Sequence, residues 1–146
     1  MNPESEDPIA HYLFANNLAG RRQFSDAIWH YNRAIELDPD NLDAEVYVFA
    51  AWLLATCPYP SLRDGERAVS YARKACEITD GEPWPLSALA AAFAEADDFP
   101  MAIDTQKKAI ELYSDYSFLE QTYLQKCDER LRRYENFQSL DYDVEP

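Results

Sequence analysis

The sequence has few of the residues from which catalytic and phosphate-binding loops are built. It contains only three glycines, and none of them belongs to a glycine-rich turn, a nucleophile elbow or a phosphate-binding loop. A nucleophilic side chain also needs a base within hydrogen-bond reach and a site for the oxyanion, and no motif supplies these groups. The sequence therefore predicts a protein that is not an enzyme and has no catalytic residues.

Soft metal ligands are also scarce. The chain has two histidines, His11 and His30, and three cysteines, Cys57, Cys76 and Cys127. None falls in a Cys-x-x-Cys or His-x-x-x-His spacing, so we expect neither a metal site nor a cofactor, and we expect His30 to be a partly exposed helix residue. The cysteines are odd in number and far apart, which favours reduced thiols over a disulfide framework.

Long hydrophobic runs and positive charge are the other two shortages. No run of about 18 apolar residues is present to cross a bilayer, and residues 1–7 are acidic and polar, unlike the start of a secretory signal. Thirteen Lys and Arg stand against 27 Asp and Glu, and a net charge of −14 repels phosphate backbones and anionic lipids. We expect a soluble, cytoplasmic protein with no nucleic-acid and no membrane partner.

The sequence does contain one phrase three times. It reads FSDAIWHYNRAIEL from Phe24 and FPMAIDTQKKAIEL from Phe99, 75 residues later, while GERAVSYARKACEI from Gly65 keeps the small residues in step. The small residues Ala27, Ala68 and Ala102 correspond to one another, as do Ala34, Ala75 and Ala109. Apolar positions within the phrase are three and four residues apart, which predicts an amphipathic α-helix.

Each phrase follows another apolar segment that can supply its helical partner. These segments are residues 9–20, 42–56 and 84–96, and each has a small residue near its middle, where two helices can approach closely. Asp-Pro and Asp-Gly pairs stand at the expected helix ends. In the middle copy the connection is five residues longer and contains Pro58, Pro60 and Asp64-Gly65, which is typical of a loop. The pattern predicts three helical hairpins.

A further amphipathic helix is expected after the third hairpin. It opens with Ser117-Phe118-Leu119-Glu120, a capping-box pattern, and carries Leu124, Cys127, Leu131 and Tyr134 along one side. Such a helix can cover the apolar side of a last repeat. We therefore expect a flexible acidic N-terminus at 1–7, repeats at about 8–41, 42–81 and 82–115, a capping helix at about 117–137, and an acidic disordered tail at 138–146.

These residues resemble the tetratricopeptide repeat, a helical hairpin of about 34 residues. Ala15, Ala27, Tyr31, Ala34 and Pro39 stand where that family has its small, small, aromatic, small and proline positions, although His11 replaces the usual tryptophan and Ser114 the third closing proline. The stretch from Ala50 to Thr79, with its Ala-Thr-Cys-Pro phrase, is similar to a bacterial variety of the repeat. The resemblance implies an all-α, right-handed superhelical solenoid of three repeats with a capping helix.

The resemblance also implies a binding site, because such stacks hold partner segments on the concave face lined by the first helix of each hairpin. Carried over by position, the partner-binding groove comprises Tyr12, Asn16, Val48, Trp52, Trp84, Ser87 and Ala91, with Ile9, Ala19, Glu45 and Glu95 beside them. If the middle register shifts by one residue, Ala44, Tyr47 and Ala51 replace the middle set. Any of these aromatics can instead be core between repeats.

The predicted function is a protein–protein interaction module, a scaffold or adaptor. Family members that grip a carboxylate use Lys, Arg and Asn on this face, and only Asn16 matches here, so the expected partner segment is neutral or basic and apolar-anchored. Two alternatives remain open: a small cytosolic chaperone that sequesters a client protein, and a regulatory or assembly subunit of an enzyme. We expect a monomer, with a homodimer through the C-terminal helix as the alternative.

Overall fold

The computed structural model describes residues 4–115, 121–143 and 146. Within these ranges the chain forms only helices and no β-strand, which confirms the predicted all-α fold. The α-helices are α1 (Pro8–Gly20), α2 (Phe24–Leu37), α3 (Ala44–Thr56), α4 (Gly65–Thr79), α5 (Pro83–Glu95), α6 (Phe99–Ser114) and α7 (Gln121–Glu135), and a 3₁₀-helix η1 (Pro60–Leu62) lies between α3 and α4. The capping-box pattern at 117–120 lies outside the described residues.

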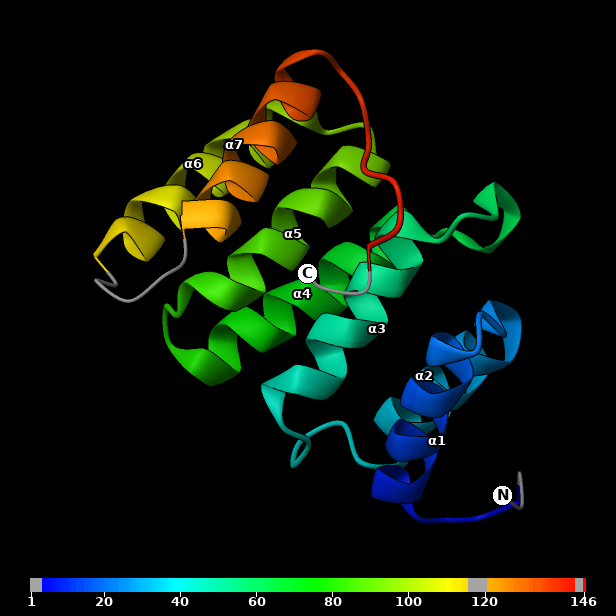
Figure 1. Cartoon of the computed structure of the whole chain (residues 1–146). Helices are drawn as coiled ribbons and strands as arrows, with labels where there is room; N and C mark the ends of the chain where they lie inside the picture. The colour runs from blue at the N-terminus through cyan, green and yellow to red at the C-terminus, as the bar shows by residue number, and fades with distance from the viewer. Residues whose placement is uncertain (1–3, 116–120, 144–145) are drawn as a thin grey trace.

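Neighbouring helices in the sequence are neighbours in space. The pairs α1–α2, α3–α4 and α5–α6 are the three predicted hairpins, and further contacts join α2 to α3, both α3 and α4 to α5, and α6 to α7. Figure 1 shows the α1–α2 hairpin at one end of the molecule and α6 with α7 at the other. No helix in the described part of the chain is long and apolar enough to span a membrane.

Alanine residues let the helices of each hairpin approach closely. The six alanines that the repeated phrase aligns, Ala27, Ala68, Ala102, Ala34, Ala75 and Ala109, are all fully buried in α2, α4 and α6. A side chain with only a methyl group allows two helix backbones to pack at a short interaxial distance. The period read from the sequence therefore corresponds to equivalent packing positions in the three hairpins.

Aspartate residues cap three of the helices, and the sequence predicts the first of these caps, at Asp7. The Asp7 carboxylate accepts hydrogen bonds from the N–H groups of Ile9 and Ala10 at 3.0 and 3.3 Å. Asp64 and Asp98 cap α4 and α6 in the same way, at 3.0 and 3.3 Å. Each bond satisfies a backbone donor that has no partner within the helix.

The turns that end α1 and α5 have the same geometry. Arg22 and Asp97, again 75 residues apart, both have φ = 61°. The next residue in each turn donates its N–H to the carbonyl five residues earlier, at 2.9 Å in the first turn and 2.8 Å in the second. This is the Schellman arrangement, and α7 ends with it too, at Phe137 (φ = 56°). The internal repeat thus extends to backbone geometry.

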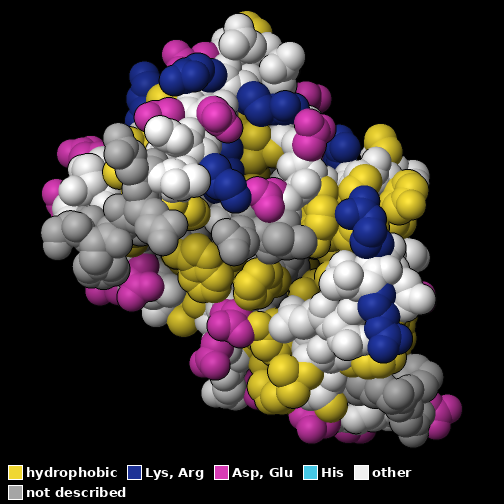
Figure 2. Space-filling view, in the orientation of Figure 1, with side chains coloured by type: hydrophobic (Ala, Val, Ile, Leu, Met, Phe, Trp, Pro, Cys, Tyr) yellow, Lys and Arg dark blue, Asp and Glu magenta, His cyan; other side chains and the backbone are white. Residues whose placement is uncertain are grey.

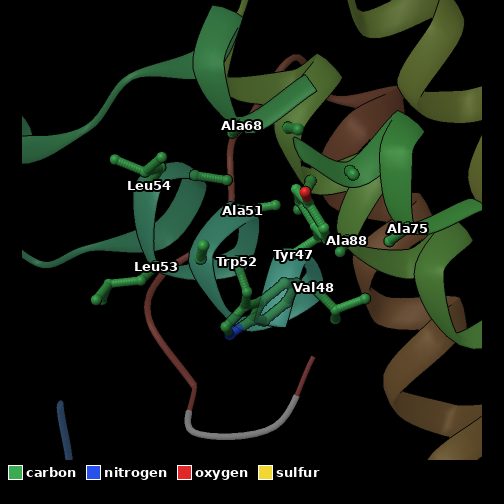
Figure 3. Close-up of a cluster of buried hydrophobic side chains, with 14 of the residues drawn as sticks. Tyr47, Val48, Ala51, Trp52, Leu53, Leu54, Ala68, Ala75 and Ala88 are labelled. Carbon is green, nitrogen blue, oxygen red and sulfur yellow. The ribbon is translucent and has the colours of Figure 1, made fainter. Parts of the chain in front are cut away.

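Helices α3 and α5 form the centre of the core. Eleven of the 13 residues of each are buried. Figure 3 shows part of this cluster, with Ala51 and Leu54 of α3 near Ala68 of α4 and Ala88 of α5 close by. In contrast, only four residues of α1 are buried. A helix that is covered on most sides has no amphipathic pattern, which is why these two segments are apolar almost throughout.

The C-terminal segment, residues 138–143, has no regular secondary structure but lies against the helices (Figure 1). Leu140 is only 5% exposed and Tyr142 is half-buried. The sequence predicts disorder from residue 138 because the segment is short and acidic. The structure differs because these two apolar side chains find surfaces on distant helices, which a local pattern does not show.

Candidate peptide-binding groove

A pocket of about 260 Å³ lies where α1, α2 and α3 meet. Its lining residues come from these three helices and from the C-terminal segment, and they are Asn16, Ala19, Gly20, Tyr31, Phe49, Trp52, Leu53 and Tyr142. A second hollow, of about 180 Å³, continues from Trp52 to the α7 residues Lys126, Arg130 and Arg133. We call the two hollows together the groove. In Figure 2 hydrophobic side chains gather in the middle of the face that it shows.

Asn16 and Tyr31 form the polar part of the pocket. The Tyr31 hydroxyl donates a hydrogen bond to Asn16 Oδ1 at 2.5 Å, which fixes the orientation of the amide. Burial raises the pKa of Tyr31, and the nearby Tyr12 hydroxyl adds to the effect, so the phenol remains a donor at neutral pH. The pocket therefore offers one oriented amide among apolar and aromatic side chains.

Trp52 lies between the two hollows. Its side chain is only 2% exposed, and its indole N–H donates to the backbone carbonyl of Asp143 at 2.6 Å. The Arg130 guanidinium carbon lies 4.9 Å from the centre of the indole ring, within the range of a cation–π contact. Trp52 therefore contacts the chain's own C-terminal segment.

The other predicted groove residues lie elsewhere. Val48 and Ser87 are fully buried and Ala91 is 1% exposed, so they present no surface to the groove. Trp84 is partly buried, with its ring 6.1 Å from that of Phe49. The buried Tyr12 hydroxyl donates to the Glu45 carboxylate and thereby ties α1 to α3.

The alternative middle register gives no exposed face either. Ala44, Tyr47 and Ala51 are all buried, and the Tyr47 hydroxyl donates to the carbonyl of Pro39. The physical reason is that α3 packs against α2, α4 and α5 together, so two of its faces are core. The sequence-based assignment treated each first helix as having one packed face and one open face, which describes α1 but not α3 or α5.

Sequence reasoning missed the basic side of the groove. Lys126 and Arg133 belong to α7, for which the sequence predicts a cap or a dimer contact, and they contact the C-terminal segment. The Lys126 ammonium lies 2.9 Å from Asp143 Oδ2, and the Arg133 guanidinium donates to the carbonyl of Ser139 at 2.6 Å. The signal was present in the concentration of Lys and Arg on the polar side of this helix.

The two histidines form a buried pair that the sequence did not suggest. His11 is fully buried and His30 is 7% exposed, rather than partly exposed as expected, with their Nδ1 atoms 2.8 Å apart. His11 Nε2 lies 2.9 Å from the carbonyl of Ser5, which assigns the proton to Nε2 and makes His11 Nδ1 the acceptor from His30. His30 is buried because the rings of Phe14 and Trp29 pack edge-on against it.

Candidate ligand and nucleophile groups do not gather elsewhere in the described ranges. There, no group of three or more His, Cys, Asp or Glu residues is arranged to hold a metal ion. Burial raises the pKa of the Cys57, Cys76 and Cys127 thiols, which lowers the thiolate fraction that nucleophilic chemistry requires. These thiols are free in the structure.

Comparisons with protein-family models and with curated proteins give no match to this chain.

Proposed function

We propose that this chain is a right-handed superhelical solenoid of three tetratricopeptide-type hairpins with a capping helix, and that it acts as a protein–protein interaction module. Two features support the repeat. The aligned alanines of α2, α4 and α6 are all fully buried, and the turns after α1 and α5 share their geometry at a separation of 75 residues. A stack of such hairpins presents a continuous surface suited to an extended ligand.

The observation that carries the proposal is the C-terminal segment in the groove. Tyr142 lines the pocket between α1, α2 and α3, and the next residue accepts a hydrogen bond from Trp52. The groove is thus wide enough for a chain without regular secondary structure, and it has donors placed for that chain's carbonyls. Binding a partner segment requires the same properties.

For the oligomeric state, we favour the expected monomer over the alternative homodimer through α7. Cys127 and Tyr134, on the apolar side of that helix, are fully buried within the chain. Gln106 of α6 donates to the carbonyl of Cys127 at 3.3 Å. Since this side already covers α6, we propose a monomer whose partner is a different protein.

Site-specific photo-crosslinking on the intact chain tests this function. A crosslinking amino acid replaces Ala19 or Phe49 in the groove, and Glu77 or Lys108 at exposed positions on α4 and α6. In extracts of the source cells, we expect adducts with another protein from the two groove positions and none from the two control positions. Adducts with a partner from the control positions alone would show that the groove is not the binding site.

Once the partner is identified, its affinity for two point variants measures the contribution of the groove. Phe49→Ala shortens a pocket-lining aromatic and should weaken binding by about 1–3 kcal/mol if the ring anchors the partner. Lys108→Glu reverses an exposed charge on α6 and should leave the affinity unchanged. Circular dichroism of both variants separates lost binding from lost folding.

A further inference from the structure

Resting on the proposed function, we propose that the groove recognises acidic segments with an aromatic residue, and that the chain's own residues 139–143, Ser-Leu-Asp-Tyr-Asp, occupy it in competition with such a partner. The segment is then an internal ligand that a partner must displace. Its contacts in the structure specify the chemistry of that partner through one aromatic anchor, two carboxylates and the backbone between them.

The aromatic anchor is Tyr142. Its ring lines the pocket between α1, α2 and α3 and lies 5.0 Å from the ring of Phe24, in an edge-to-face arrangement. Burial raises the pKa of the Tyr142 hydroxyl, so the side chain is neutral where it lines the pocket. Aromatic side chains bury a large area at low entropic cost, which makes this residue the expected main source of affinity.

The two carboxylates face cations of α7. Asp143 Oδ2 lies 2.9 Å from the Lys126 ammonium, and Asp141 Oδ2 lies 3.4 Å from the Arg133 guanidinium. α7 therefore places a mainly basic strip along one side of the groove, with Lys126, Arg130 and Arg133 beside one carboxylate, Glu129. Such a strip attracts acidic segments and disfavours basic ones, because like charges placed together oppose binding.

Backbone contacts complete the recognition without specifying sequence. The Trp52 indole donates to the carbonyl of Asp143, and Arg133 Nε and Nη2 both donate to the carbonyl of Ser139, at 3.1 and 2.6 Å. Any extended segment offers carbonyls, so these donors add affinity for many sequences. Selectivity then depends on the aromatic ring and on the two carboxylates.

The segment is held in a way that permits displacement. The side chains of Lys126 and Asp143 are 38% and 41% exposed, and that of Asp141 is 86% exposed, so these ion pairs are screened by solvent. A tethered segment still competes at an effective concentration on the order of millimolar for a short linker. A free acidic segment should therefore bind the parent chain weakly and bind more tightly once the internal segment is loosened.

This partner chemistry differs from the neutral or basic segment that the sequence predicts. That expectation rested on the lack of Lys and Arg in the first helices of the hairpins, and the described parts of α1, α3 and α5 indeed contain none. The difference arises because α7 brings Lys126 and Arg133 to the groove edge, where the sequence order gave no reason to place them.

The test uses the full chain and a fluorescent, end-blocked peptide of residues 138–143. The receptor is the variant Tyr142→Ala with Asp143→Lys, which removes the anchor and repels Lys126, and its control is Gln138→Ala, an exposed position in the same segment. We expect the peptide to bind the loosened variant at least ten-fold more tightly than it binds the parent or the control. Asp143→Asn, which removes only the charge pair, gives a second receptor with a smaller gain.

Two altered peptides test the chemistry. A peptide with Tyr142→Ala should bind the loosened receptor at least ten-fold more weakly than the native sequence, and one with both aspartates changed to lysine should also bind more weakly. If the lysine peptide binds as tightly as the native one or more tightly, the acidic preference is wrong. If no peptide binds either folded receptor, the segment is a structural strap and the proposal fails.

Failure here is distinguishable from failure of the proposed function. The crosslinking experiment reports whether the groove contacts another protein, whatever its charge, whereas the peptide experiment reports whether the chain's own segment mimics that ligand. Protein adducts from Ala19 and Phe49 together with absent peptide binding would retain the first proposal and reject the second. The exchange rate of the Trp52 indole N–H adds a direct check, since loosening the segment should accelerate it in the variant.

Discussion

The two ends of the series of helices differ in whether a further helix covers them. At one end α7 covers α6, and its own Cys127 and Tyr134 are fully buried. At the other end the α1–α2 hairpin has no further helix over it in the described chain, and Ile9, Leu13 and Trp29 are between 48% and 60% exposed. The repeated phrase is similar in both hairpins, so the difference comes from what packs against them rather than from the hairpins themselves.

This contrast shows why the groove lies where it does. Near the covered end, α5 is buried on most sides and has no surface for a ligand. In contrast, α1 contributes Asn16 and Ala19 to an open pocket. The C-terminal segment connects the two ends, because it follows α7 and its Tyr142 ring reaches Phe24 of α2. A partner that displaces the segment would therefore also remove this contact between the two ends.

The largest expected effect comes from removing the cover. Deleting residues 116–146 removes α7 and exposes α6 side chains that now pack against it, including Gln106 and Tyr113. We expect the truncated chain to aggregate and to lose more than about 3 kcal/mol of unfolding free energy, since truncating one buried aromatic side chain alone costs about 3–5 kcal/mol. Light scattering after gel filtration and urea unfolding measure the two effects.

Two point variants, one at each end, compare the stability contribution of the covered and open ends more directly. Tyr134→Ala at the covered end leaves a cavity at a fully buried site. Like the truncation, it should lower the free energy of unfolding, by about 3–5 kcal/mol. Leu13→Ala at the open end removes a side chain that is 60% exposed and should change stability by less than about 0.5 kcal/mol. Similar losses at both sites would mean that the α1–α2 end is covered in solution.

The next effect concerns the close approach of Gly65 to the end of α5. A Cβ on Gly65 would lie 2.6 Å from the backbone nitrogen of Ala96 and 2.8 Å from the carbonyl carbon of Glu95, and neither atom can move alone. Gly65→Ala should therefore destabilise the chain by about 1–3 kcal/mol, as overpacking does.

The control for this change lies at the open end. Gly20 has nothing within 4 Å of its would-be Cβ, so Gly20→Ala should be neutral or slightly stabilising, because alanine is the better helix former. Urea unfolding of both variants measures the difference. An equal effect at the two glycines would argue against the tight contact between α4 and α5.

Much of the fold was predictable because its determinants are local. The repeated alanines, the capping aspartates and the prolines after them depend on helical period and on turn chemistry, and these patterns do not change with the surroundings. The long connection before Gly65 was recognisable from its prolines in the same way. All of these features lie within one hairpin.

The groove was less predictable because it depends on distant contacts. Of the residues that the sequence proposes for it, Asn16 and Trp52 line the pocket, but Val48 and Ser87 are buried where α3 and α5 meet several helices at once. The basic strip and the Tyr142 anchor arise only when α7 and the C-terminal segment fold back on the first hairpins. No periodicity within a single segment reports such an arrangement.

A smaller effect is the pH dependence of stability that the histidine pair at the open end produces. Burial lowers the pKa of His30 from its ordinary value near 6.5, and the neighbouring His11 lowers it further, while Asp26 acts in the opposite direction. The unfolded chain therefore takes up a proton first as the pH falls, and stability is lost below about pH 6.5. Urea midpoints at pH 7 and pH 5 should differ more for the parent than for His30→Asn, which retains a donor near the same place. Equal pH dependence would exclude this pair as the cause.

The smallest effect compares a largely buried ion pair between the α3–α4 connection and α5 with a more exposed pair near the open end. Arg63 and Glu95 join the α3–α4 connection to α5 at 3.6 Å, with both side chains less than 20% exposed, whereas Arg33 and Glu6 pair at 3.7 Å near the open end and Glu6 is 82% exposed. Burial raises the pKa of Glu95 more than Arg63 lowers it, so the folded chain holds this proton more tightly than the unfolded chain does.

The folded chain should therefore gain stability as the pH falls from 7 through the raised pKa of Glu95, and Glu95→Gln should remove that gain. At pH 7 we expect the free energies of unfolding of Glu95→Gln and Glu6→Gln to lie within about 0.5 kcal/mol of the parent value, because single ion pairs of this kind contribute little to stability. Only the Glu95 variant should alter the pH profile between 7 and 5, measured by urea unfolding. A loss of more than 1 kcal/mol in Glu95→Gln at pH 7 would instead show that Arg63 depends on this carboxylate to hold the α3–α4 connection in place.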